Sequence, residues 1–106
     1  MIDSERVFSF RALSFARNDQ SPLPGYEQND YVRYTDFDSR NLADMIEEFA
    51  TVRRATIQLF RPLSETEWLR RGKANEKEIS VRALAYIIAG HELHHMEVLR
   101  SRYLQS

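Results

Sequence analysis

The chain contains no cysteine, so its fold has no disulfide bond and no thiolate is available as a metal ligand or nucleophile. Only three glycines and three prolines occur among the 106 residues, which leaves long stretches without a helix breaker. No segment reaches the ~18 consecutive apolar residues of a membrane span, and charged residues occupy the N-terminal segment where a signal peptide would be apolar. We therefore expect a cytoplasmic protein.

The charge balance is close to neutral, with 15 basic and 16 acidic residues and a formal net charge of −1. This balance gives no electrostatic reason to expect binding to nucleic acid or to a membrane surface. Hydrophobic residues make up 42% and charged residues 29% of the chain, which is typical of a globular protein. At this length we expect one domain, residues 1–106.

The hydrophobic pattern predicts an all-α, up-and-down bundle of three long helices. A roughly 20-residue connection with turn residues and four aromatics should separate the first two helices, and its length suggests that it is ordered or functional. A short capped turn at Ser64–Trp68 and a polar connector at 70–75 should precede the third helix. The expected helices are residues 3–17, a segment capped by Asp38 or Ser39 that ends at Pro62, and a segment from Ser80 to about Leu104.

The third predicted helix is apolar on every side over Ala83–Ala89. A helix of this kind is normally surrounded by other elements, and two further long helices are too few to enclose it. We therefore expect a missing neighbour, either a second copy of the chain in a homodimer or a segment that is not present.

His91 and His95 lie four residues apart in this helix, so both imidazoles should lie on one face, in positions where packing alone would favour Leu or Ile. A buried imidazole needs a hydrogen bond, a metal or water. The pair therefore predicts either a site for a divalent metal such as zinc or nickel, or two hydrogen-bonded histidines at the core or in a wet cavity. His94 points off this face and is a candidate either for a third ligand or for a residue that supports a metal ligand by hydrogen bonding.

The segment His91-Glu92-Leu93-His94-His95 also satisfies the H-E-x-x-H pattern of zinc peptidases, in which the glutamate is the general base. The further ligand that these enzymes need downstream has no good candidate here. A catalytic site needs about three protein ligands, and the first turn of the N-terminal helix offers Asp3 and Glu5. Alternatively, both acids simply favour the helix dipole.

Several other residues have both a functional and a structural interpretation. Gly90 indicates either close approach by a helix or substrate, which would make it a pocket residue, or a tolerated surface glycine. Tyr26 and Trp68 are either cover for the core or walls of a substrate pocket. The pairs Arg53-Arg54 and Arg70-Arg71 are interpreted as solvated faces, with nucleic-acid contact as the alternative.

Three motifs in this order resemble the DinB-like superfamily, and more closely its branch of YfiT-type metal-dependent hydrolases. The resemblance extends over nearly the whole chain. The motifs are Asp3–Phe8 followed by Phe10–Leu13, then Pro22–Tyr26, and finally Gly90–His95 before Leu99–Tyr103.

This resemblance implies a four-helix bundle with a divalent metal on three histidines, two of which correspond to His91 and His95. The family's other histidine would stand immediately before Met1, so relative to the family the chain lacks that ligand and the first helix. Family activities include hydrolysis and thiol-dependent transfer on small molecules, and the missing histidine would impair them. The alternative from another class is a non-catalytic oligomerisation or scaffold domain with vestigial histidines.

Overall fold

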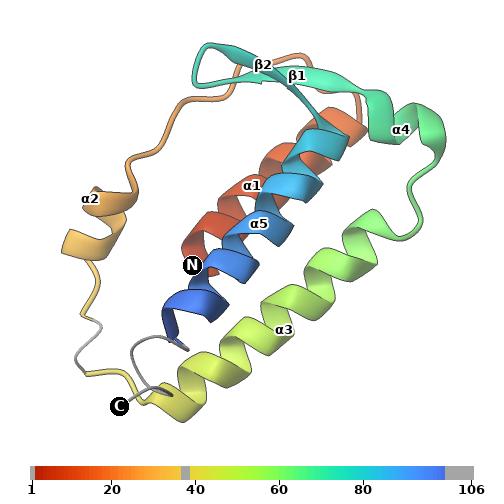
Figure 1. The fold of residues 1–106 in the computed structure, drawn as a ribbon. Coiled ribbons are helices and arrows are strands. Elements are labelled where there is room, and N and C mark those ends of the chain that lie inside the picture. Colours follow the sequence, from red (N-terminus) through yellow and green to blue (C-terminus); the bar gives the residue numbers. More distant parts are fainter. Residues whose placement is uncertain (1, 37–38, 100–106) are drawn as a thin grey trace.

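The computed structural model describes the backbone of residues 2–36 and 39–99, and their side chains except those of 28, 29, 32 and 91–99. Within these residues, three long helices form an elongated bundle, and a two-stranded hairpin crosses one end of it (Figure 1). The elements are α1 (Ile2–Ala16), α2 (Gln28–Arg33), α3 (Leu42–Phe60), α4 (Glu65–Leu69), β1 (Arg71–Ala74), β2 (Lys77–Ser80) and α5 (Val81–Leu99). This arrangement confirms the prediction of an all-α bundle.

Helix α1 is the centre of the bundle, because it packs against both α5 and α3. The long connection between α1 and α3 returns to the starting end, so these two helices run parallel and α5 runs antiparallel to both (Figure 1). Helices α3 and α5 hardly touch each other directly within the described residues. Phe60 at the end of α3 belongs to one buried cluster with Leu84 and Ile88 of α5, and the Trp68 ring of α4 stacks on Phe60 with 5.4 Å between ring centroids.

The hydrophobic core lies at the hairpin end of the bundle. Phe15, Leu84 and Val81 are the largest fully buried side chains. The buried cluster consists of Ala12, Phe15, Ala16, Phe60, Ala74, Val81, Leu84 and Ile88. Because six of these eight residues belong to the second half of α1 and the first half of α5, apolar packing is concentrated where those two halves meet.

Helix ends follow local chemistry. Helix α1 ends with Asn18 in the left-handed conformation (φ 62°), and the Asp19 amide donates to the Ser14 carbonyl, as in a Schellman motif. Helix α3 begins at Leu42 because the Asn41 side chain accepts from the Ala43 amide, and the predicted start near 38–39 was wrong. Ser64 forms the expected capping box at α4.

The predicted polar connector at 70–75 is instead the first strand of a hairpin. Strands β1 and β2 pair antiparallel through a turn in which Asn75 and Glu76 both have positive φ, 55° and 65°. Leu23 joins the edge of this hairpin in parallel with Ala74, because its amide donates to the Lys73 carbonyl. The hairpin thereby holds the connection after α1.

One side of α5 is open. Val81, Leu84 and Ile88 are buried, whereas Tyr86 is 66% exposed. The described neighbours therefore cover only part of the apolar circumference predicted from sequence. None of the helices in the described part of the chain is both long and apolar enough to cross a membrane.

Candidate functional site

Helix α5 continues without interruption through the positions of His91, His94 and His95. Residues 91 and 95 consequently lie one helical turn apart on the same face, and residue 94 is rotated away from that face. The side chains of all three lie outside the described residues, so their roles remain predictions.

Asp3 lies at the same end of the bundle as the second half of α5. Helices α1 and α5 run antiparallel, which brings the first turn of α1 beside that half (Figure 1). Asp3 is half-buried and makes no hydrogen bond or ion pair with any described residue. No group of three potential metal-binding side chains occurs among the described residues, so a role for Asp3 as third ligand also remains a prediction.

Glu5, the other acid of this turn, is fully engaged by α3. Its side chain is 4% exposed, and Arg53 Nη2 donates to Oε1 at 2.7 Å while Arg53 Nε lies 3.1 Å from Oε2. Thr56 Oγ1 donates to Oε2 at 2.7 Å. Because both carboxylate oxygens are occupied, Glu5 is a structural anchor between α1 and α3 and not an available ligand.

Two arginines have partners that the sequence did not indicate. The expectation that Arg53 belongs to a solvated face was wrong, because its side chain is only 19% exposed in the ion pair with Glu5. Arg11 is buried as well, and its Nη2 donates to the Pro24 carbonyl at 2.9 Å. Arg53 and Glu5 lie 48 residues apart in the chain, so no local sequence pattern indicates this ion pair.

Tyr26 fixes the connection after α1 to the first turn of that helix. Its hydroxyl donates to Ser4 Oγ at 2.6 Å, and Ser4 is 2% exposed. The Tyr26 ring meets Phe8 and Tyr31 edge-on, with centroids 6.1 and 5.2 Å away. Tyr26 also lines a hollow between α1 and this connection. The residue therefore combines the structural role predicted for it with a place at a surface cavity.

Gly90 is exposed, and a Cβ added to it would meet no atom within 4 Å. No described atom therefore approaches Gly90 from the direction in which a side chain would project. The geometry thus matches a tolerated surface glycine, and contact of Gly90 with a substrate remains a prediction.

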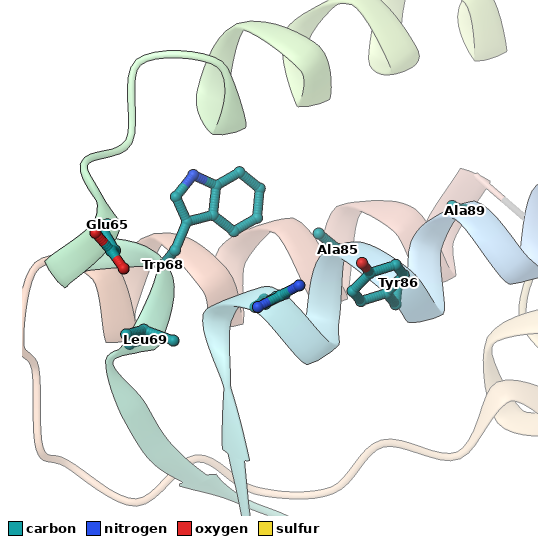
Figure 2. A pocket seen from close by; sticks show the side chains of 7 residues that line it. Glu65, Trp68, Leu69, Ala85, Tyr86 and Ala89 are labelled. Carbon is teal, nitrogen blue, oxygen red and sulfur yellow. The ribbon is translucent and has the colours of Figure 1, made fainter.

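A cavity of about 600 Å³ lies between α4 and α5. Figure 2 shows the Trp68 indole projecting from α4 toward Ala85 of α5, with the Tyr86 ring further along the same helix. Trp68 thus both covers the core by stacking on Phe60 and forms a cavity wall. The lining of this cavity is mainly apolar and consists of Trp68, Leu69, Ala85, Tyr86 and Ala89. One acid, Glu65, and one base, Arg82, complete it.

This cavity continues toward α3 as a groove. Trp68, Ala85 and Ala89 also line a second hollow, whose opposite wall is formed by Ile57 and Phe60 of α3. The groove follows the side where α3 and α5 are not in direct contact. Its lining is mainly apolar and also includes Arg53 and Arg61, so it can accept an apolar ligand.

Comparison with known proteins agrees with this fold. The family model of the DinB superfamily matches residues 1–99 of the chain. No curated protein and no solved structure gives a match. Since the family match covers nearly the entire chain, the protein belongs to the DinB superfamily.

Proposed function

We propose that this chain binds a divalent metal, zinc or nickel, through His91 and His95. The proposal is supported most directly by the unbroken helix α5, which sets the two positions one turn apart on one face. Membership in the DinB superfamily supports the same assignment.

The donors available at this end of the bundle fit such a metal. Imidazole nitrogen and carboxylate oxygen are both accepted ligands of zinc, and a catalytic site takes about three of them from the protein. Asp3 is the proposed third donor because it belongs to the first turn of α1, which lies at this end of the bundle, and it has no partner among the described residues. Glu5 is excluded by its contacts with Arg53 and Thr56.

The proposed reaction is hydrolysis or thiol-dependent transfer on a small molecule. A metal bound here would supply a Lewis acid that lowers the pKa of a coordinated water or thiol. The chain's own residues would hold the substrate. One wall of the substrate site would be the connection beside α1, which is fixed by the hydrogen bond from Tyr26 to Ser4 and by the hydrogen bond from Arg11 to the Pro24 carbonyl. The Trp68 cavity would receive an apolar group, and its last lining residue, Ala89, precedes His91 by two positions.

The direct test is metal binding measured by isothermal titration calorimetry with Zn²⁺ and with Ni²⁺. We expect saturable binding by the wild-type chain and a loss of about a hundredfold or more in affinity for His91→Ala and for His95→Ala. His94→Ala is the comparison variant: it removes an imidazole from the same helix, at a position rotated by about 100° from His95, and should weaken binding less than either of the other two histidine variants. Asp3→Asn should weaken binding less than either histidine variant.

Two results would contradict the proposal. The first is the absence of saturable binding by the wild-type chain. The second is equal loss in all three histidine variants, which would indicate nonspecific binding by surface imidazoles. Circular dichroism of each variant separates loss of the site from loss of the fold.

The second candidate function is a non-catalytic oligomerisation or scaffold domain with vestigial histidines. The observation that favours it is the exposed apolar surface of α3, where Leu42 is 70% and Ile46 is 60% exposed. This function predicts no metal binding, together with self-association that His91→Ala and His95→Ala leave unchanged.

A further inference from the structure

An apolar strip runs along the open side of α3. Ile57 lies in the groove opposite Ala85 and Ala89 of α5, and it is 43% exposed. Ile46 lies about three helical turns before Ile57, and Leu42 lies about four turns before Ile57. All three residues therefore share one face of α3. Exposed apolar residues gathered on one helix face mark an interaction surface more clearly than scattered ones do.

The charges of α3 are divided between its two halves. Asp44, Glu47 and Glu48 lie in the N-terminal half, and Arg53 and Arg54 in the C-terminal half, with Arg61 at the C-cap. Glu48 is paired with Arg6 and Arg40, and Arg53 with Glu5. Glu47 and Arg54 are exposed and form no ion pair among the described residues.

A helix of this kind is electrostatically complementary to a second copy of itself in the antiparallel direction. In that orientation the acidic half of each helix meets the basic half of the other. A parallel pairing would instead set like charges against each other. A purely acidic or purely basic partner would match only one half of the strip.

We propose that the open face of α3 is a homodimer interface, in which α3 of each protomer packs antiparallel against α3 of the other across a two-fold axis. An axis passing midway between Thr51 and Val52 sets Ile46 opposite Ile57 of the other copy. Glu47 then lies within two residues of the position opposite Arg54 of the other copy, which allows an ion pair between Glu47 and that Arg54. The two-fold axis repeats the pair, so each dimer contains two of them. The contact is isologous, as closed dimers require.

The packing of α1 explains why this face is free. Helix α1 contacts both α3 and α5, whereas α3 and α5 make hardly any contact with each other among the described residues. The α3 helix of a second copy would therefore add a helix where a four-membered bundle has its fourth position.

Charge exchange tests this interface without removing apolar residues. Glu47→Arg places two like-charged pairs in the dimer, and so does Arg54→Glu. An equimolar mixture of these two variants has opposite charges in both pairs. We expect each variant alone to weaken dimerisation at least about tenfold and the mixture to restore it as a heterodimer.

Sedimentation velocity across the micromolar range gives the readout, in EDTA so that a bridging metal cannot contribute. Ile46→Lys should abolish the dimer, whereas Tyr34→Lys should leave it intact, because Tyr34 is 83% exposed outside α3. A folded wild-type monomer at all concentrations would overturn the proposal. A dimer whose mixed charge variants fail to associate would overturn the antiparallel α3 pairing.

Discussion

Removal of the Glu5 carboxylate should destabilise the fold more than removal of the whole ion pair. Glu5→Leu leaves the Arg53 guanidinium without its counter-ion at a site where the side chain is only 19% exposed. Breaking a buried pair from one side costs about 3–5 kcal/mol, and partial hydration of Arg53 reduces this to about 2–4 kcal/mol. With a urea slope of about 1–2 kcal/mol per molar, the midpoint of unfolding should fall by about 1–4 M.

A double-mutant cycle checks the reasoning. Arg53→Met alone leaves Glu5 with only the Thr56 hydroxyl as a donor among the described side chains, so it should also destabilise strongly. The double variant Glu5→Leu/Arg53→Met has no buried charge and should recover most of the loss. Urea titrations followed by circular dichroism give the four free energies. Additive costs, or a single-variant cost below about 1 kcal/mol, would refute the assignment of this pair as a buried anchor.

Two glycine substitutions should have opposite effects on thermal unfolding. Gly72→Ala should destabilise by about 1–3 kcal/mol, because the new Cβ would lie 2.2 Å from the fully buried Phe15 ring. Gly90→Ala should stabilise by up to about 1 kcal/mol, because the added methyl group would meet no described atom within 4 Å. Equal effects would contradict the packing. The hydrogen bond from Arg40 holds the pKa of Glu48 below its ordinary value of 4.5, so the unfolded chain takes up this proton first as the pH falls. The stability contributed by the pair of Glu48 and Arg40 should be complete above pH 4.5 and should be lost as the pH falls through the lower pKa of the folded state. In urea titrations, the free energy of unfolding of Glu48→Gln should therefore depend less on pH in the acid range.

The helices were largely predictable from sequence because their signals are local. Apolar period, the Ser64 capping box and the breaker Pro62 determine most of the boundaries. The hairpin was missed because strands Arg71–Ala74 and Lys77–Ser80 are short and charged, without clear apolar alternation. Its turn uses Asn75-Glu76, where the usual signal is Asn-Gly.

The candidate site was predictable only in its helical spacing. Residues 91 and 95 share a face in any α-helix, so the sequence determines that relation directly. Which acid of the first turn lacks a partner among the described residues depends on tertiary contacts, because Glu5 meets Arg53 and Thr56 of α3 and Asp3 does not. The cavity beside Trp68 likewise depends on the relative positions of α4 and α5, and no short-range pattern encodes those positions.

The uneven distribution of packing along α1 has a consequence for hydrogen exchange. The Ala12–Ala16 half is embedded in apolar side chains, whereas the first turns are held by polar contacts of Ser4 and Glu5. Amides of the apolar half should therefore exchange only through global unfolding, and those of the polar half through smaller openings. A ligand bound at the polar end would slow exchange locally before it changed the global melting temperature. The end of the molecule that carries the histidine positions is thus also the end whose order a ligand can regulate.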